Sequence, residues 1–320
     1  MPRVLVVAPN WIGDALMAQP LFARLHEKAP GLHVDVLAPE WVAAVVRRMP
    51  EVDNVIPVPF RHGALQLRSR WKIGRELRAR GYAKAIVLPN TWKSALVPFF
   101  AGIPLRSGYV GESRYGLLNQ LYRKTGAPMP LHYARLAEAP GKQPQEPLPR
   151  ARLRAVPHDI EAVKRRFGID GGYAVLCPGA EYGPAKRWPY FRELSEQAGL
   201  QAVVLGSAND AQAAQGIRGM NLVGRTSLDE AIDLIAGAQL VVSNDSGLMH
   251  VAAALGRPMV ALFGSSSPSH TPPLSGAARV LWLHLECSPC YERVCPLGHF
   301  RCMREIGVET VLKEIQNLGV

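Results

Sequence analysis

Residues Ser243–His250 carry the sequence SNDSGLMH, and the pattern around them decides the fold. The preceding run, residues 239–243, is short, apolar and rich in β-branched side chains, which predicts a buried strand. Residues 251–258 predict a helix that stops at a Gly-x-Pro end, and residues 259–264 predict a second buried strand. This order predicts a parallel sheet whose polar loop lies at the carboxyl end of a strand, where open α/β sheets bind ligands.

The polar loop is a candidate phosphate site. A helix N-terminus offers free N–H groups and a partial positive charge, which suits a diphosphate. Beside Asp245, Ser246 adds a hydroxyl, Gly247 lets the backbone approach a ligand closely, and His250 lies one turn further along the same helix face. Asn, Asp and Ser are also ordinary helix caps, so the local pattern fits a structural role equally well.

Composition bounds the class of protein. The chain has 320 residues, of which 48% are hydrophobic, enough for two domains with full-sized cores. No apolar run reaches the roughly 18 to 20 residues that cross a bilayer. The early run Val4–Ala8 is too short for a signal peptide and is followed at once by polar residues, so it predicts a first strand. We therefore expect a cytoplasmic protein.

The charge favours an anionic partner. The formal net charge is +11, which suits nucleic acid, an acidic lipid surface or a phosphorylated substrate. The densest basic run extends from Arg61 to Lys84, and a solvated helix face is the alternative interpretation of it. Only Trp71 and Tyr82 interleave with its cations, so a stacking platform for nucleic acid is poorly supported.

The order of patterns predicts two α/β domains joined by a linker. Residues 1–140 and 158–320 each alternate apolar runs with helical segments, which predicts a Rossmann-like, doubly wound parallel sheet in each domain. Residues 141–157 are rich in proline and predict the linker. Two such domains facing each other predict a ligand cleft between them. The C-terminal helix could pack back toward the first domain. Strands are expected at residues 3–8, 33–37, 54–58, 84–88, 173–177, 201–205, 221–223, 239–243, 259–264 and 279–283. Further helices are expected at residues 14–28, 41–49, 65–80, 92–101, 158–167, 188–198, 208–217, 227–236 and 308–318.

The first strand-to-helix loop excludes two common cofactor folds. Residues 10–14, NWIGD, lack the Gly-x-Gly-x-x-Gly dinucleotide fingerprint, and no P-loop motif occurs in the chain. Asp14 places a carboxylate at a helix start, where it could act as a general base toward a hydroxyl acceptor. An acid there is also favoured by the helix dipole, and the residues alone favour this second interpretation.

The loops that follow strands in the second domain contain basic side chains and residues that can cap helices. Residues 177–189 are rich in glycine and carry Lys186 before a helix, which is typical of a loop that closes on phosphates. An exposed loop with ordinary surface bases has the same composition. Asp210 could accept a hydrogen bond from a ribose hydroxyl, or it could cap a helix. Thr226 lies in a capping box, residues 224–230, whose backbone could contact the edge of an adenine ring.

Four of the five cysteines cluster at Cys287, Cys290, Cys295 and Cys302. A disulfide framework is not expected in a cytosolic protein. Four thiols within sixteen residues could hold zinc or an iron–sulfur cluster, although the spacing is not the paired Cys-x-x-Cys of zinc ribbons. The alternative is a compact, reduced loop without metal.

Several separated motifs together resemble one known family. They are residues 10–20 (NWIGDALMAQP), 178–189 (PGAEYGPAKRWP), 243–250 (SNDSGLMH), 263–268 (FGSSSP) and 287–295 (CSPCYERVC). In this order they resemble the lipopolysaccharide heptosyltransferases, the ADP-heptose transferase family of bacterial core-oligosaccharide assembly. The resemblance extends from about residue 3 to the end of the chain. Asn10-Trp11 and the cysteine loop favour the second transferase of that assembly over the first.

The resemblance implies a GT-B fold and a role for each motif. The N-terminal domain would bind the acceptor beside the loop of Asn10, Trp11 and Gly13, and the C-terminal domain would bind ADP-heptose. Asp14 would be the general base and Lys186 would stabilise the departing diphosphate. The donor would contact the remaining matched residues, which are Asp245, Ser246, Gly247 and His250, with Asp210 and Thr226 near the ribose and adenine. The reaction would be an inverting displacement at the anomeric carbon by a hydroxyl of an inner-core heptose.

The resemblance also implies partners. The acceptor would be a phosphorylated lipid A core, so the segment Arg61–Lys84 would meet the anionic cytoplasmic face of the inner membrane as a peripheral contact. No nucleic-acid partner is expected. No Asp-x-Asp pair occurs, so no cofactor is expected, and Lys186 with helix dipoles would stabilise the leaving group. Assistance by Mg²⁺ stays open.

Three other functions compete. Another GT-B nucleotide-sugar enzyme, such as an epimerase, would act without an acceptor, and transfer to a different core acceptor is a closer variant. A nucleic-acid binder is suggested by charge alone and lacks a fold motif for that role. A Rossmann dehydrogenase is weakened by the missing glycine fingerprint.

Overall fold

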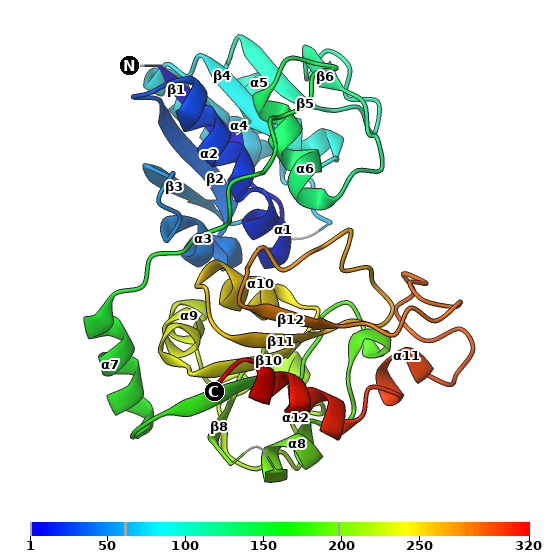
Figure 1. Cartoon of the computed structure of the whole chain (residues 1–320). Helices are drawn as coiled ribbons and strands as arrows, with labels where there is room; N and C mark the ends of the chain where they lie inside the picture. The colour runs from blue at the N-terminus through cyan, green and yellow to red at the C-terminus, as the bar shows by residue number, and fades with distance from the viewer. Residues whose placement is uncertain (1, 61–62, 198) are drawn as a thin grey trace. The chain divides into compact units, whose positions relative to one another are not determined.

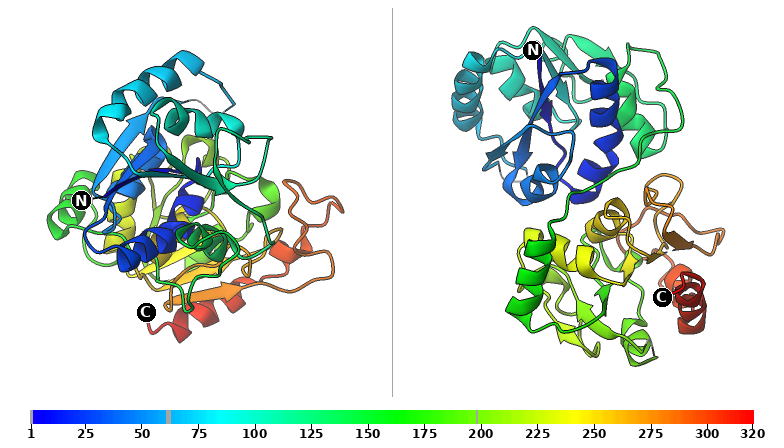
Figure 2. Two further views of the ribbon diagram at one scale, coloured as in Figure 1. Left: turned by 90° about the horizontal axis from the view of Figure 1, so that it is seen from above. Right: turned by 60° about the vertical axis from the view of Figure 1, so that its left-hand side comes forward.

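The computed structural model describes residues 2–60, 63–197 and 199–320. The chain divides into two compact units, Met1–Ala151 and Arg152–Val320, and each is built on its own sheet (Figure 1; Figure 2). The division falls inside the proline-rich segment, of which residues 141–156 form neither helix nor strand. Arg24 donates to the carbonyl of Gln145 and to that of Pro147 at 2.9 Å, which binds the start of this segment to the first unit.

The first unit contains a six-stranded parallel sheet. Its strands pair in the order β3-β2-β1-β4-β5-β6, and every pairing is parallel. The chain therefore changes direction across the sheet between β1 and β4, and such a switch point is where open α/β sheets bind ligands. The bounds are β1 Arg3–Val7, β2 His33–Pro39, β3 Asn54–Val58, β4 Lys84–Val87, β5 Leu105–Tyr109 and β6 Gln120–Tyr122.

Helices cover both faces of this sheet, with α2 and α6 on one side and α4 and α5 on the other (Figure 1). Strand β1 is buried after its first residue, as expected for a strand covered on both faces. Helix α4 packs so closely on α5 that a Cβ at Gly74 would lie 2.6 Å from the Cβ of Phe100, so only glycine fits there. The bounds are α1 Ile12–Met17, α2 Gln19–Lys28, α3 Glu40–Arg47, α4 Leu67–Leu77, α5 Leu96–Phe100 and α6 Met129–Ala134, with short 3₁₀ turns η1 Arg78–Arg80, η2 Trp92–Ala95 and η3 Arg135–Ala137.

Several features of the first unit differ from the sequence-based expectation, among them α6, where no helix is predicted. The helix expected over residues 14–28 is broken at Ala18, because Pro20 stands in the first turn of α2 and has no N–H to continue the α1 hydrogen-bond ladder. Strands β5 and β6 were not expected. Arg106, Ser107 and Gly108 interrupt the apolar run of β5, and β6 is only three residues long.

The second unit repeats the architecture. Its strands pair in parallel in the order β12-β11-β10-β7-β8-β9, with the switch point between β7 and β10. The predicted α/β fold class, a doubly wound parallel sheet in each half of the chain, is confirmed. The bounds are β7 Tyr173–Cys177, β8 Gln201–Val204, β9 Met220–Asn221, β10 Leu240–Asn244, β11 Met259–Leu262 and β12 Ala278–Leu281.

The helices of the second unit fill its core from both faces. The C-terminal helix α12 inserts Val311 and Ile315 into this core and packs against β11 and α8. The helix expected at residues 208–217 is wrong: Ser207 and Asp210 form a capping box, but only the turn η5 follows it, and Gly216 adopts a φ of 77°. The bounds are α7 Pro157–Phe167, α8 Phe191–Gln197, α9 Leu228–Gly237, α10 Gly247–Ala254, α11 Arg301–Arg304 and α12 Val308–Asn317, with 3₁₀ turns η4 Pro184–Lys186 and η5 Ala208–Asp210.

None of the helices in the described part of the chain combines the length and the apolar composition that a membrane span requires.

Candidate functional site

An ion pair at the switch point of the second unit joins two of the predicted loops. The buried side chain of Asn244, at the end of β10, accepts from the N–H of Trp188 at 3.1 Å and donates to the carbonyl of Pro178 at 2.7 Å. These bonds hold the loop after β7 against the end of β10. As a result the Nζ of Lys186 lies 2.5 Å from Oδ2 of Asp245, two residues that are far apart in the sequence.

Asp245 contacts three other side chains of this cluster. It is 4% exposed, and besides Lys186 it accepts a hydrogen bond from the Oγ of Ser266 at 2.5 Å. Nε2 of His250 lies 3.9 Å from its other oxygen. The ammonium of Lys186 also lies 5.0 Å from the ring centroid of Tyr182, within cation–π range. A cation held in place at low exposure beside a helix N-terminus is suited to an anionic ligand.

Helix α10 begins at this cluster. Ser246 caps it, since its Oγ accepts from the N–H of Met249 at 3.4 Å, and Gly247 is its first residue. The structural interpretation of Ser246 as a cap is therefore correct. It does not exclude a ligand role, because the N–H groups of a helix's first turn have no partners within the helix.

His250 is held in its neutral form. Burial is the largest influence and lowers the pKa of the imidazole to about 4; the charge of Asp245 opposes this and the charge of Lys186 reinforces it. The site at neutral pH therefore contains one ammonium, one carboxylate and an uncharged imidazole that can donate or accept one hydrogen bond.

The buried histidine predicts an acid-sensitive stability. Below pH 6.5 the unfolded chain takes up a proton on His250 that the folded chain does not accept until about pH 4. The unfolding free energy should therefore fall by up to about 3 kcal/mol between these pH values. Urea unfolding of wild type and His250→Asn from pH 7 to pH 4 measures it. The variant should show a shallower decline, and parallel declines would contradict the assignment.

Two further predicted donor residues lie on neighbouring loops of the second unit. Asp210 is 7% exposed; its Oδ2 accepts from Ser207 twice, at 2.8 and 2.9 Å, while its Oδ1 has no hydrogen-bond partner among the described residues. Thr226 immediately precedes the cap Ser227 of α9 and is half-buried. The N–H of Gly224 bonds to the carbonyl of Gly206 at 3.0 Å, which brings the two loops together.

The predicted acceptor loop lies in the first unit, at the carboxyl end of β1. Asp14 is in the first turn of α1, and the buried hydroxyl of Tyr133 on α6 donates a hydrogen bond to its carboxylate. Burial, and then the charge and hydrogen bond of Asp14, raise the pKa of Tyr133 well above its ordinary value. The indole of Trp41 donates to the carbonyl of Asn10 at 2.8 Å. Trp11 is exposed at the start of this helix, and Gly13 lies within its first turn.

The four cysteines of the loop, Cys287, Cys290, Cys295 and Cys302, form no disulfide in the structure. Cys302 is buried, and burial together with the nearby Cys290, Cys287 and Cys295 raises its pKa to about 11. Burial raises the pKa of Cys295 also, but N–H groups of residues 297–300 outweigh this and lower it. Across residues 2–60, 63–197 and 199–320, no three His, Cys, Asp or Glu side chains are arranged to hold a metal ion.

Only some of the cations in the basic segment Arg61–Lys84 are exposed to solvent. Arg68, Lys72 and Arg75 are exposed on successive turns of α4. Arg70 is not: it is 6% exposed, stacks 4.0 Å above the ring of Phe60 and donates to the carbonyl of Leu65 at 2.6 Å. The expectation that the segment Arg61–Lys84 meets an anionic surface therefore does not hold for Arg70. Arg61, its first residue, lies outside the described residues.

Comparison with known proteins decides the family. The sequence profile of glycosyltransferase family 9 (heptosyltransferase) matches residues 70–301, which is well over half of the chain. The chain belongs to glycosyltransferase family 9. It is therefore an enzyme, a heptosyltransferase, and the resemblance found in its motifs is confirmed.

Individual relatives extend the match over the whole chain. Lipopolysaccharide heptosyltransferase 2 of Escherichia coli is 42% identical over 99% of this chain and 98% of its own length. Lipooligosaccharide heptosyltransferase 2 of Haemophilus influenzae is 40% identical over 88% of both chains. The solved structure of E. coli ADP-heptose LPS heptosyltransferase II has a TM-score of 0.87 at 40% identity, covering 99% of this chain and 98% of that one.

The site of this heptosyltransferase includes three residues that the sequence did not single out. Asn244 and Ser266 were quoted within motifs but given no role. Asn244 ends the buried strand β10 and Ser266 follows the buried strand β11, which is the signal that could have identified them. Tyr133 lies on a short helix with no motif around it. Only the packing of α6 against α1 reveals its contact with Asp14.

Proposed function

We propose that this heptosyltransferase moves a heptose from ADP-heptose to the first heptose of the lipopolysaccharide inner core. The Lys186–Asp245 pair is the observation that carries the proposal, because it supplies a held cation at the switch point of a parallel sheet. The relatives named for lipopolysaccharide and lipooligosaccharide heptosyltransferase 2 cover most or all of the chain, which supports this choice of substrates.

The second unit would bind the donor. The ammonium of Lys186 and the first turn of α10 would hold the diphosphate and stabilise the charge that develops as ADP leaves. The neutral imidazole of His250 would donate one hydrogen bond without adding charge. The free Oδ1 of Asp210 would accept a hydrogen bond from a ribose hydroxyl. The loop of Thr226 would contact the edge of the adenine ring.

The first unit would bind the acceptor, beside Asn10, Trp11 and Gly13. Asp14 would accept the proton of the attacking hydroxyl, and the hydrogen bond from Tyr133 would orient its carboxylate. Attack from the face opposite to the diphosphate would invert the anomeric centre. In this single displacement the acceptor oxygen forms a bond to the anomeric carbon and the bond from that carbon to the diphosphate breaks. The hydroxyl proton would go to Asp14 and the electron pair would leave with ADP, so no further reactant is required.

Release of ADP tests the proposal against an epimerase. Wild-type enzyme is incubated with ADP-heptose alone, with a purified core that carries one heptose, and with a core that carries none. ADP should appear at a substantial rate only with the heptose-bearing core. Equal ADP release in all three reactions, or isomerised sugar nucleotide without ADP, would contradict it.

We also propose that the exposed cations Arg68, Lys72 and Arg75 bind the anionic membrane surface on which the acceptor lies. Reversing all three to glutamate should reduce binding to liposomes that contain anionic lipid, by about 1 kcal/mol for each cation near the surface. Co-sedimentation with liposomes at low and high salt measures this. Binding to ADP should be unchanged.

A variant of equal charge is the control. Arg165, Arg218 and Lys313 are exposed cations of the second unit, and their triple change to glutamate alters the net charge by the same amount. This control should keep most of its liposome binding. If both triple variants lose binding alike, net charge rather than the α4 surface is responsible.

A further inference from the structure

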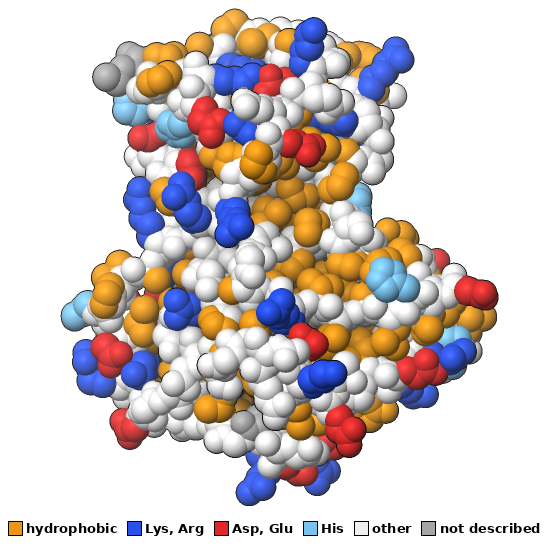
Figure 3. All heavy atoms as spheres, in the orientation of Figure 1, with side chains coloured by type: hydrophobic (Ala, Val, Ile, Leu, Met, Phe, Trp, Pro, Cys, Tyr) orange, Lys and Arg blue, Asp and Glu red, His pale blue; other side chains and the backbone are white. Residues whose placement is uncertain are grey.

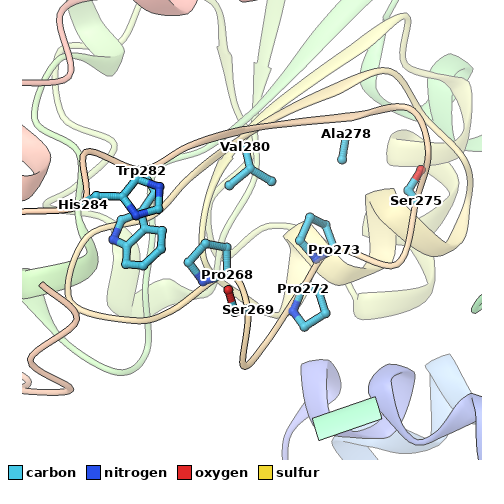
Figure 4. A pocket seen from close by; sticks show the side chains of 9 residues that line it. All are labelled: Pro268, Ser269, Pro272, Pro273, Ser275, Ala278, Val280, Trp282 and His284. Carbon is cyan, nitrogen blue, oxygen red and sulfur yellow. The ribbon is translucent and has the colours of Figure 1, made fainter. Parts of the chain in front are cut away.

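A hollow in the second unit lies apart from the Lys186–Asp245 cluster. It has a volume of about 410 Å³ and is lined by residues between Pro268 and His284. These come from the segment that joins β11 to β12, from β12 and from the residues just after it. In Figure 4, Trp282 and His284 stand at one end and the rings of Pro272 and Pro273 at the other.

The lining is uncharged. It offers an indole, an imidazole, proline rings and the hydroxyls of Ser269 and Ser275, and no Asp, Glu, Lys or Arg is among the described residues that form it. A phosphate or nucleotide diphosphate would therefore find no cation here. An acyl chain would offer no partner to the hydroxyl of Ser269, whereas the hydroxyl of Ser275 already accepts from the N–H of Ala277 at 3.1 Å. A pyranose ring has apolar C–H faces that pack on an aromatic ring and hydroxyls at its edge, so it matches both parts of the lining.

The aromatic end of the hollow is held in place. The indole Nε1 of Trp282 donates to the Oγ of Ser288 at 2.9 Å, and this hydroxyl donates to the carbonyl of Gly264 at 2.7 Å. The ring of His284 lies 3.9 Å from the indole, measured between centroids. A surface with fixed orientation loses little conformational freedom when a ligand binds, which favours affinity.

The same loop joins the hollow to the proposed reaction centre. The carbonyl of Gly264 accepts the hydrogen bond from Ser288. Two residues later, the hydroxyl of Ser266 donates to the carboxylate of Asp245. Pro268 then begins the lining. The donor has two sugar rings: its heptose must stay beside Lys186 for the reaction, and its ribose is assigned to Asp210 under the proposed function. A sugar in the hollow therefore comes from the acceptor.

We propose that this hollow binds a neutral sugar ring of the acceptor oligosaccharide, stacked on Trp282. This inference rests on the proposed function, since it names a further subsite for the same acceptor. It places part of acceptor recognition in the second unit, in addition to the first-unit loop of Asp14.

Steady-state transfer to a delipidated core oligosaccharide tests the subsite. Trp282→Ala should raise the KM for this oligosaccharide about tenfold, the loss expected from about 1.4 kcal/mol of aromatic contact. The KM for ADP-heptose should stay within about twofold of wild type, because the diphosphate contacts are unchanged. Trp282→Phe keeps an aromatic face and should retain most of the affinity. Trp71→Ala removes an exposed indole of the first unit and should change neither KM.

The outcomes separate this inference from the proposed function. No transfer by wild type would overturn the proposed function itself. Transfer with an unchanged acceptor KM in Trp282→Ala would overturn only the subsite. A raised KM for ADP-heptose in Trp282→Ala would assign the hollow to the donor, and an effect seen only with an acylated acceptor would assign it to a lipid chain. Either result would also overturn the subsite.

Discussion

Asp14→Asn should lower kcat for heptosyl transfer by about 10²- to 10⁴-fold, the range usual for loss of a general base. The amide has nearly the shape of the carboxylate but cannot take up the proton of the attacking hydroxyl. Binding of ADP-heptose should be unchanged, because the proposed donor contacts all come from the second unit. Single-turnover transfer and calorimetric binding of ADP-heptose would measure the two quantities separately.

A second aspartate of the same sheet is the matched control. Asp53 precedes β3, at the amino edge of the sheet, whereas Asp14 follows β1 at the carboxyl edge. Asp53→Asn should leave kcat within about twofold, as for surface changes away from a site. Tyr133→Phe should lower kcat less than Asp14→Asn, since it removes only the hydrogen bond that orients the carboxylate. If Asp14→Asn retains full transfer, another group is the base.

Lys186→Met should lower kcat by about 10²- to 10³-fold, comparable to removal of one group that stabilises developing charge. It should also weaken binding of ADP, because it removes the cation that we propose holds the diphosphate. Lys313→Met removes an exposed lysine of the same unit and should leave both quantities unchanged. Transfer rates and calorimetric titration with ADP would measure the effects.

Stability must be separated from catalysis in this experiment. Lys186→Met leaves the carboxylate of Asp245 buried without its cation, and breaking a buried pair in this way is destabilising. The double variant Lys186→Met with Asp245→Asn removes the lone charge, so its urea unfolding should return toward wild type. Transfer by the double variant should stay low. Recovery of transfer together with stability would show that Lys186 acts only through folding.

The sequence predicts the strands of the second unit better than its irregular parts. β7 is buried along its whole length, and its boundaries come directly from an uninterrupted apolar run. The segment after β8, residues 208–217, was predicted as a helix. A capping box, in which Ser207 donates to the carboxylate of Asp210, begins a turn there, but the turn does not continue into an α-helix, and composition does not reveal where it stops.

The candidate site was predicted residue by residue but not as an arrangement. The sequence placed Lys186 and Asp245 on two loops that follow strands, and the sheet order β10-β7 makes those loops neighbours. Their pairing depends on the bonds of Asn244, and the partner of Asp14 is a tyrosine on α6. Both contacts join residues that are distant in the sequence, so only the packed fold shows them. Arg70 was misplaced for the same reason, because the ring that covers it belongs to another segment.

The mass of the acceptor is the most direct test of the account. Wild-type enzyme is incubated with ADP-heptose and a purified core that carries a single heptose, and the core is then weighed by mass spectrometry. We predict a gain of one heptose, attached to the heptose already present, with one ADP released for each core extended. Consumption of ADP-heptose while the core keeps its original mass would contradict the account.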